Sequence, residues 1–216
     1  MKINIMNDFG IQPNFKNAFL DGILEMSEFS NRTFEIQDLG LWRREGWGNQ
    51  LLLSPFNSID WYINQSLDKE REQINAQNLM ALFYCEPWQD DSKHLDLFIT
   101  NRDLFAPGTN FVLGYALPGV GAVVSTKRFA NMSLNLACEC LKTLTMHEFG
   151  HVLGIVPDYR RFNVEESLGK HCTNQCLMRQ GLTVNKWVSM THDRLRGPAL
   201  CQMCQNDLLA LAHFNS

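Results

Sequence analysis

The chain has 216 residues, of which 45% are hydrophobic and 19% are charged, and its formal net charge is −4 at pH 7. This composition is typical of a globular protein with a substantial core, and the length favours one domain spanning 1–216. The sequence has no basic patch, and no stretch approaches the roughly 20 apolar residues of a membrane-spanning helix. We therefore expect neither a nucleic-acid partner nor a membrane partner.

The first eight residues, MKINIMND, alternate in polarity and then turn acidic. They lack the long apolar core that a signal peptide requires. A cytoplasmic location is the expectation that follows, and we expect the protein to act as a monomer.

The first half of the chain alternates between predicted strands and predicted helices. A helix is expected from about Pro13, because apolar residues recur on one face between Phe15 and Met26. A second helix is expected to begin at a cap, Ser58, and to run to about Gln73. This alternation implies a mixed sheet with helices packed on it. The predicted strands cover residues 2–6, 33–41, 79–85 and 95–100.

A loop rich in tryptophan, arginine and glycine is expected from Trp42 to Gly48. A plain surface loop is the favoured interpretation, and contact with a substrate or partner is the alternative. Residues 51–53 are expected to form a short arm of a hairpin.

A hairpin is predicted from two short strands at about 110–116 and 120–126, joined by Pro118 and Gly119. Gly114 inside the first strand would allow another backbone to come close. An edge strand of this kind can pair with an extended peptide by β-addition. A plain structural hairpin is equally compatible with the pattern.

The stretch that ends at Gly154 reads Met-His-Glu-Phe-Gly-His-Val-Leu-Gly, a His-Glu-x-x-His pattern among apolar residues. A helix beginning after residue 131 or 133 would place His147 and His151 on one face, because residues four apart share a helix face. Glu148 would then reach a zinc-bound water without being a ligand itself. An ordinary buried helix with two core histidines is the alternative.

Catalytic zinc sites usually have three protein ligands and one open position. Gly154 indicates that the helix ends soon after His151, because glycine readily takes the left-handed conformation found at helix ends. A third ligand must then come from the residues that follow.

The chain has seven cysteines, and four of them form two close pairs near the C-terminus. In a reducing compartment such pairs indicate metal ligands before disulfides. Cys201 and Cys204 form a Cys-x-x-Cys turn. Cys172 and Cys176 would complete four tetrahedral sulfur ligands for a structural zinc, which would contribute to the folding of this segment. Four unrelated thiols are the alternative.

Taken together, these residues resemble one family, the archaemetzincins, which belong to the metzincin clan of zinc-dependent metallopeptidases. The resemblance covers roughly residues 95–210. In that family a His-Glu-x-x-His-x-x-Gly-x-x-His motif is followed at once by Cys, then by Cys-x-Met and a terminal Cys-x-x-Cys. The residues that carry the resemblance are Asp103-Leu104-Phe105, Asn110-Phe111-Val112-Leu113-Gly114, Val124-Ser125 with Arg128, the metal helix and the cysteine-rich tail.

The chain departs from the family pattern between the metal helix and the first cysteine. In the compact family spacing the third histidine falls at Pro157, which cannot bind zinc. About fourteen extra residues within Ile155 to Lys170 precede His171, which with the next residue looks like the His-Cys junction of the family. We therefore expect the third ligand at His171, and the insertion is interpreted as a flap beside the cleft or as a plain loop. The rivals of His171 are Asp158 and, more distantly, Glu165 or Glu166.

A second departure is smaller. The first cysteine pair has three intervening residues where the family usually has four. Flexible thiolates should absorb that change.

The resemblance implies an α/β fold of the α+β zincin-like kind. Its parts are a mixed twisted sheet, a backing helix, an active-site helix and a small zinc-stapled C-terminal subdomain. Within one domain, residues 1–154 would hold the sheet and the active-site helix. Residues 155–216 would hold the insertion, a Met-turn at Met178 and the four-cysteine part.

The resemblance also implies two Zn²⁺ ions and a peptide or protein substrate. The catalytic zinc, held by His147, His151 and His171, would activate water for peptide-bond hydrolysis. Glu148 would serve as general base and then as general acid, and Tyr159 is a further candidate for stabilising an oxyanion. A non-catalytic zinc-binding interaction module with a degenerate metalloprotease site is the alternative function. The structural zinc would be held by Cys172, Cys176, Cys201 and Cys204.

Overall fold

The computed structural model of the protein describes residues 1–40, 59–86, 89 and 93–212. Its centre is a five-stranded sheet formed by β1 (Lys2–Asn7), β2 (Glu35–Gly40), β5 (His94–Thr100), β7 (Gly114–Leu117) and β8 (Gly121–Ser125). The order is β2-β1-β5-β8-β7, and neighbours are parallel except for β7, which runs antiparallel to β8. The predicted hairpin is therefore present, and its first strand lies at an edge of the sheet. This strand begins at Gly114, later than the predicted start at about residue 110.

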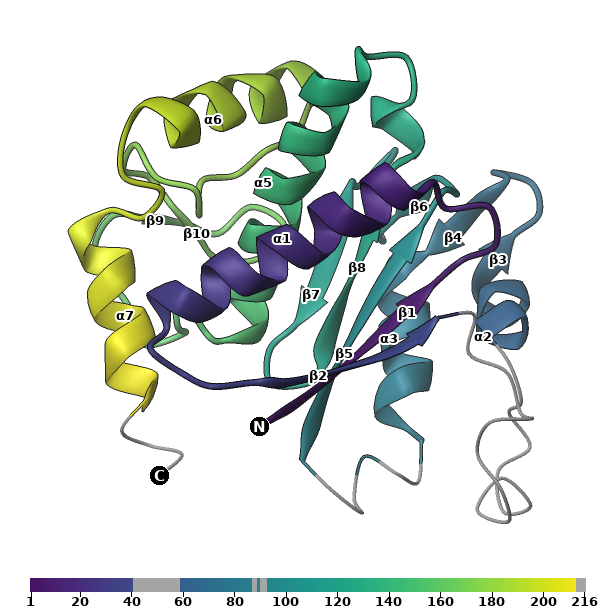
Figure 1. The fold of residues 1–216 in the computed structure, drawn as a ribbon, viewed down its shortest axis with the longest axis horizontal. Helices are drawn as coiled ribbons and strands as arrows, with labels where there is room; N and C mark the ends of the chain where they lie inside the picture. Colours follow the sequence, from purple (N-terminus) through teal and green to yellow (C-terminus); the bar gives the residue numbers. More distant parts are fainter. Residues whose placement is uncertain (41–58, 87–88, 90–92, 213–216) are drawn as a thin grey trace.

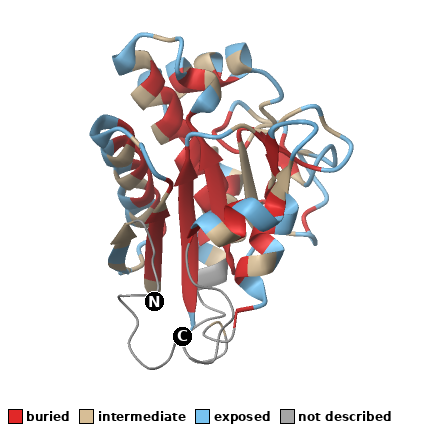
Figure 2. Ribbon diagram, turned by 90° about the vertical axis from the view of Figure 1, so that its right-hand side faces the viewer, coloured by how far each residue is buried: buried red, intermediate tan, exposed pale blue. Residues whose placement is uncertain are grey.

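Helices cover both faces of this sheet, and for that reason β5 is buried along its whole length (Figure 2). Because strand side chains alternate between faces, Leu97 and Ile99 enter one core while Phe98 enters the other. The first core also receives α1 (Pro13–Phe29) and α5 (Leu134–Val152) (Figure 1). The second core receives α2 (Ile59–Ser66) and α3 (Ala76–Tyr84).

The sequence prediction is wrong for the helix that was expected to run to Gln73. This helix, α2, ends at Ser66, and the charged residues after it form a turn between β3 (Leu67–Asp68) and β4 (Gln73–Asn75). Strand β4 also pairs with β6 (Leu104–Phe105) in a separate small sheet. The Ser58 cap, the Trp42–Gly48 loop and the hairpin arm at 51–53 lie outside the described residues.

The strand predicted at 79–85 is also wrong, because residues 79–84 belong to helix α3 and Cys85 is its C-cap. The side chain of Asn75 caps this helix by accepting a hydrogen bond from the Asn78 N–H at 3.1 Å. A short apolar run does not by itself distinguish a buried strand from a buried helix. The cap, and burial against the second core, decide for the helix.

An ion pair holds the loop that leads into the edge strand β7. Arg128, in the short 3₁₀ helix Lys127–Phe129, donates through Nε and Nη2 to the two carboxylate oxygens of Asp103, at 2.8 and 2.7 Å. Its guanidinium carbon also lies 3.6 Å from the centre of the Phe111 ring. Asp103, Phe111 and Arg128 are among the residues that carry the family resemblance, and together they fix the approach to β7.

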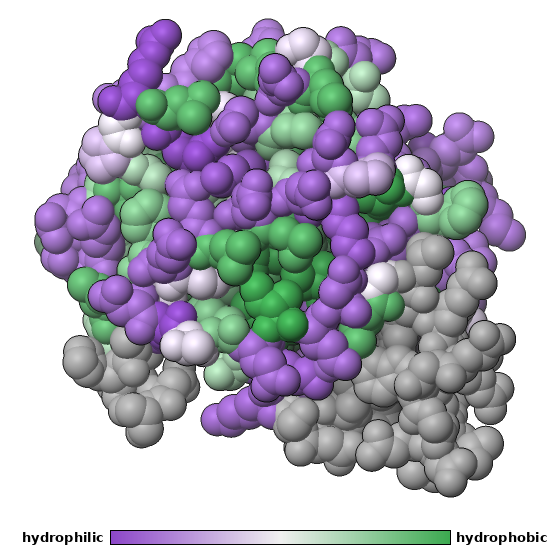
Figure 3. Space-filling view, in the orientation of Figure 1, coloured by the Kyte–Doolittle hydropathy of each residue, from purple (hydrophilic) through white to green (hydrophobic). Residues whose placement is uncertain are grey.

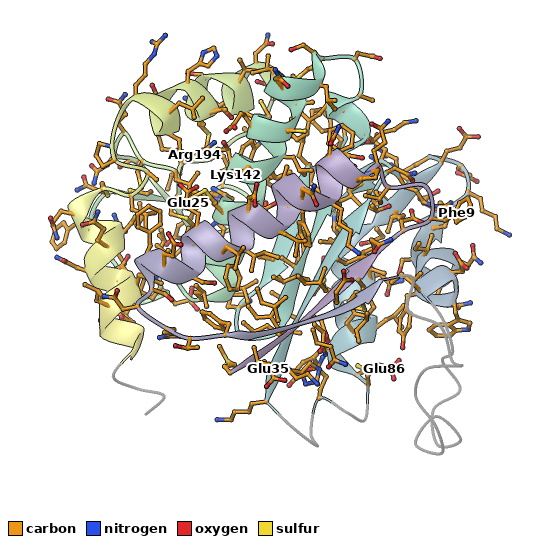
Figure 4. The ribbon with its side chains drawn as sticks, viewed as in Figure 1. Phe9, Glu25, Glu35, Glu86, Lys142 and Arg194 are labelled. Atoms are coloured by element: carbon orange, nitrogen blue, oxygen red, sulfur yellow. The ribbon has the colours of Figure 1, made fainter. Side chains whose placement is uncertain are left out.

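The C-terminal part packs beside α5 and contains β9 (Val164–Glu165), β10 (His171–Cys172), α6 (Val184–Arg196) and α7 (Gln202–Ala212). Glu25, Lys142 and Arg194 converge from α1, α5 and α6 (Figure 4). The Glu25 carboxylate lies 2.7 Å from Lys142 Nζ and 3.6 Å from Arg194 Nη1. These ion pairs connect the C-terminal part to the two helices of the first core.

The outer surface is mixed in polarity. On the face seen in Figure 3, apolar side chains gather between α1 and β2, within a mostly hydrophilic surround. None of the described helices combines the length and the apolar character that crossing a membrane would require.

Candidate metal centres and active-site cleft

Helix α5 ends directly after the His-Glu-x-x-His pattern, as predicted. Gly154 has φ +86° and its N–H donates to the His151 carbonyl at 2.9 Å. The Ile155 N–H donates to the Gly150 carbonyl, also at 2.9 Å. These two hydrogen bonds form a Schellman motif, which turns the chain away from the helix just past the second histidine.

The structure brings three predicted site histidines together. The donor atoms of His147, His151 and His171 all lie within 4.8 Å of one another. The Nε2 atoms of His147 and His151 are 3.2 Å apart, and two nitrogens on one tetrahedral zinc would be about 3.3 Å apart for Zn–N bonds of about 2.0–2.1 Å. The donor set therefore fits a single zinc ion.

Backbone carbonyls orient two of these rings. His147 Nδ1 donates to the Leu177 carbonyl at 2.8 Å, and His171 Nδ1 donates to the Gly169 carbonyl at 3.3 Å. A histidine whose Nδ1 carries the proton keeps Nε2 as an acceptor for a metal. In His147 the nitrogen that faces the cluster, Nε2, is therefore the one able to bind, and in His171 Nε2 is likewise left as an acceptor.

Burial keeps the three histidines neutral. It lowers the pKa of His147 to about 3, and nearby His171 adds to the effect. Burial also lowers the pKa of His151 and of His171 below their usual range. Because a metal binds the neutral imidazole, these rings need not lose a proton before binding at neutral pH.

Glu148 lies beside the histidine cluster, against the edge strand. A Cβ atom added to Gly114 would lie 2.5 Å from Glu148 Oε1. The glycine in β7 thus leaves room for the carboxyl group between helix and sheet. Burial raises the pKa of Glu148 to about 8, so this group can both hold and release a proton near neutral pH.

Two other side chains pack against the cluster. A Cβ atom on Gly150 would lie 2.7 Å from Met178 Sδ, so this glycine lets the buried methionine contact the backbone of α5. Trp187, from α6, sets its ring edge-on to His147, with 5.1 Å between ring centres, and its Nε1–H donates to the Gly181 carbonyl at 2.9 Å. Met178 and Trp187 thus form an apolar support for the histidine-bearing part of α5.

A cleft of about 600 Å³ contains His147, Glu148, His151 and His171. One side is formed by residues 111–116, which include most of β7, and the other by residues 154–158, 168–171 and 180–182. Its lining is mostly apolar outside these four groups, as expected for a site that binds side chains and excludes water. The edge strand borders the cleft.

The rival third ligands do not join the histidine cluster. Asp158 lines the cleft but is exposed, and Glu165 is exposed on β9. Glu166 is exposed and pairs with Lys170. Among the described residues, the groups with three or more potential ligand atoms close together are the histidine cluster and the four cysteines.

The four predicted cysteines also come together. Their Sγ atoms lie within 4.8 Å of one another, and those of Cys172 and Cys201 are 3.8 Å apart. Two sulfurs on one tetrahedral zinc, with Zn–S bonds of about 2.3 Å, would be about 3.8 Å apart. Hydrogen bonds from Cys176 and Cys204 lower the pKa of Cys172, and the same bonds raise the pKa of Cys176 and Cys204. The cluster therefore stabilises one thiolate, at Cys172, through its thiol neighbours.

Sequence reasoning missed three residues of these centres. Trp187 has no local signal, because its contact with the metal helix depends on how α6 packs. Tyr115 lines the cleft on β7, whereas the predicted oxyanion residue Tyr159 is 62% exposed and lies outside the cleft lining. Arg160 was not singled out within the insertion, yet it contacts the cysteine cluster.

Comparison with known sequences gives partial matches. No family model matches the chain. It is 38% identical to the archaemetzincin of Archaeoglobus fulgidus over 84 residues, which are 38% of this chain and 44% of the relative. It is 34% identical to the archaemetzincin of Nanoarchaeum equitans over 109 residues, half of each chain. The chain thus spans about half the length of the curated relatives it matches.

Comparison of folds covers nearly the whole chain. The crystal structure of archaemetzincin from Methanopyrus kandleri matches with a TM-score of 0.68 and 22% identity, covering 99% of this chain and 96% of that one. A zinc-dependent peptidase from Methanocorpusculum labreanum matches with a TM-score of 0.60 and 17% identity, covering 95% and 99%. The predicted fold class and the predicted archaemetzincin resemblance are confirmed.

Proposed function

We propose that this archaemetzincin-like chain is a zinc-dependent peptidase that uses Glu148 as general base and general acid. One observation carries the proposal: three neutral histidine donors and one buried carboxyl group meet in a cleft bordered by an edge strand. The names of its relatives, archaemetzincin and zinc-dependent peptidase, support the same reaction class.

His147, His151 and His171 would hold the catalytic zinc. Three histidines leave one position open on a tetrahedral ion, which distinguishes a catalytic site from a closed structural one. When bound, zinc supplies a Lewis acid that polarises a carbonyl group and lowers the pKa of a water molecule.

Glu148 would move the proton during hydrolysis. Its carboxylate takes a proton from the attacking water, and the resulting carboxylic acid gives it to the leaving amine as the peptide bond breaks. A cation nearby favours the carboxylate, whereas burial favours the acid. The cation and burial have opposite effects on the pKa of Glu148. This balance suits a group that must be a carboxylate in one step and a carboxylic acid in the next.

Strand β7 would hold the substrate. It lies at an edge of the sheet and lines the cleft with residues 114–116. An extended peptide can add to such an edge through main-chain hydrogen bonds, leaving its side chains to the apolar walls. The substrate is therefore a peptide or an unfolded protein segment.

A second zinc would be structural. Cys172, Cys176, Cys201 and Cys204 supply four sulfur donors, so the ion they hold keeps no open position. This ion would join β10 to α7 and contribute to folding of the C-terminal part. The protein would then bind two zinc ions, one for each centre.

The test is a Glu148→Gln variant, which keeps the size of the side chain but cannot accept the proton. Hydrolysis of a fluorogenic peptide library should fall by at least about 100-fold, the contribution of general base catalysis, while zinc content and folding stay at the parent level. Glu28→Gln, at an exposed carboxylate on α1, is the matched control and should hydrolyse like the parent.

Two results would count against the proposal. Hydrolysis by Glu148→Gln at the parent rate would remove Glu148 from the mechanism. A zinc-loaded parent that cleaves no library peptide would favour the alternative, a non-catalytic zinc-binding interaction module.

A further inference from the structure

The inserted segment, residues 155–170, is anchored to the strand that carries ligands of both proposed zinc sites. Its strand β9 pairs antiparallel with β10. Glu165 lies opposite His171 in this pair, and Val164 lies opposite Cys172. The segment thus pairs with the strand that carries His171 and Cys172, so it is more than a plain loop.

Arg160 makes the second anchor of the segment. Its side chain is permanently charged, yet the residue is only 6% exposed. Its Nη1 donates to Cys204 Sγ at 3.3 Å and to the Asp207 carboxylate at 2.8 Å. Its Nη2 donates to Cys172 Sγ at 3.3 Å, and further N–H groups donate to carbonyl oxygens of its own segment. One guanidinium group therefore bridges the insertion and both cysteine pairs.

The chemistry of a four-cysteine site explains why a cation should lie there. Four thiolates carry more negative charge than one zinc ion neutralises, so the closed site keeps a net negative charge. Burying this charge is costly unless a cation or hydrogen-bond donors reach the sulfurs.

Neutral donors reach some of these sulfurs as well. The Asn174 amide donates to Cys201 Sγ at 3.4 Å, and the Cys201 N–H donates to Cys176 Sγ at 3.3 Å. Within the described part of the chain, Arg160 is the cationic side chain whose hydrogen bonds reach the cluster.

We propose that Arg160 is a positioning residue of the four-cysteine site. Its guanidinium group offsets the negative charge of the metal-bound thiolates of Cys172 and Cys204, and through the same contacts it holds the inserted segment against β10. This inference rests on the proposed structural zinc site and gives the insertion a role in it. The Asp207 carboxylate, which accepts a hydrogen bond from the same Nη1 at 2.8 Å, orients the guanidinium group.

The chain offers a matched control in the next residue. Arg161 is exposed and makes no hydrogen bond or ion pair with the described residues. Arg160→Gln removes the charge at the cluster, Arg160→Lys keeps the charge but loses the planar fork of donors, and Arg161→Gln removes an equal charge from the surface.

The experiment replaces zinc by Co²⁺ in the full chain and records the near-ultraviolet charge-transfer absorption from sulfur to the metal. Histidine ligands give no such band, so the reading reports the four-cysteine site without reference to hydrolysis. Donors at sulfur withdraw electron density and raise the energy of this transition. The band of Arg160→Gln should therefore move to longer wavelength, and that of Arg161→Gln should not move.

Titration with a chelator gives the second reading. Arg160→Gln should release the sulfur-bound metal at a chelator concentration about 10- to 100-fold lower than the parent, the usual effect of removing a partner of a metal ligand. Arg160→Lys should lie between Arg160→Gln and the parent, and Arg161→Gln should match the parent.

The outcomes separate this inference from the function proposed above. An unshifted band and parent-like retention in Arg160→Gln would overturn the role of Arg160 while leaving the zinc site in place. If Arg160→Gln does not fold, an unshifted band and parent-like retention in Arg160→Lys would overturn the positioning role of the guanidinium hydrogen bonds to Cys172 and Cys204. A parent without the sulfur band would overturn the four-cysteine site itself, and with it this inference.

Discussion

The position of Glu148 depends on the absence of a side chain at Gly114. Its carboxyl group rests against Gly114, and burial between α5 and β7 raises its pKa to about 8. A residue with a side chain at position 114 would occupy the same space. The glycine in the edge strand therefore leaves room for Glu148. The sequence pattern predicted room for another backbone at this position and did not identify Glu148 as the neighbour.

Gly114→Ala should impair hydrolysis without removing the metal. The new Cβ atom would lie 2.5 Å from Glu148 Oε1, so the carboxyl group must shift. A misplacement of this order costs about 100-fold in rate, which kcat/KM on a fluorogenic peptide would measure beside zinc content.

Gly197→Ala is the control for this glycine substitution. A Cβ atom there would have the Asp193 carbonyl oxygen as its neighbour at 3.8 Å, an ordinary contact. Full activity in Gly114→Ala would show that Glu148 tolerates displacement and would count against its role as the base.

The sequence spacing alone did not predict His171, the third histidine of the cluster. His147 and His151 are four apart on one helix, so their spacing alone predicts a shared face. His171 follows an insertion, and its place in the cluster depends on the pairing of β9 with β10. Family resemblance favoured His171 over Asp158, and the structure brings His171 into the cluster.

Among the elements, helix α5 was the easiest to predict and α3 the hardest. The end of α5 at Val152 follows from Gly154, whose positive φ closes the helix. In α3 the apolar residues are too continuous to reveal a helical period, and its cap, Asn75, was not recognised. Local capping and packing against the second core settle what the periodicity leaves open.

The ion pair between Asp103 and Arg128 sets the stability of the loop before β7. Burial acts to raise the pKa of Asp103, but hydrogen bonds from Arg128 and Gln73 outweigh it and hold the pKa below its ordinary value of 3.8. Because the folded state lowers this pKa, the carboxylate stabilises the fold above that value. The stabilisation is lost as pH falls through the lowered pKa.

Asp103→Asn should therefore destabilise the protein at pH 7 by about 2 kcal/mol, the scale of hydrogen bonds to charged groups. The difference in unfolding free energy between Asp103→Asn and the parent should become smaller as pH falls below about 4, because the Asp103 carboxylate of the parent is then protonated. Urea unfolding at neutral and acidic pH measures both. Asp21→Asn, at an exposed carboxylate, is the control, and a difference that does not change with pH would contradict the ion-pair explanation.

At the scale of the whole molecule, the two proposed metal centres lie next to each other. His171 and Cys172 are neighbours in β10, so one strand would supply a ligand to each centre. The sheet and α5 hold one side of the cleft, and the C-terminal part supplies the other. A substitution that removes a ligand of one centre should therefore alter metal binding at the other through this strand.

Metal analysis of the purified chain tests the two-centre proposal. The parent should hold two zinc ions, and His171→Ala and Cys201→Ala should each lose a different one. Cys201→Ala should also unfold at lower temperature, because binding at a closed structural site contributes to folding. One zinc ion, lost only in Cys201→Ala, would leave the histidine cluster without metal and would count against the peptidase proposal.

The sequence pattern predicted the features that depend on local geometry. The spacing of the two histidines, the glycine that ends their helix, the paired cysteines and the alternating strands each depend on a few neighbouring residues. The convergence of His171, Trp187 and Arg160 on these centres depends on the packing of segments far apart in the chain. No local period encodes such contacts, because they form only when the sheet, α6 and the inserted segment pack together.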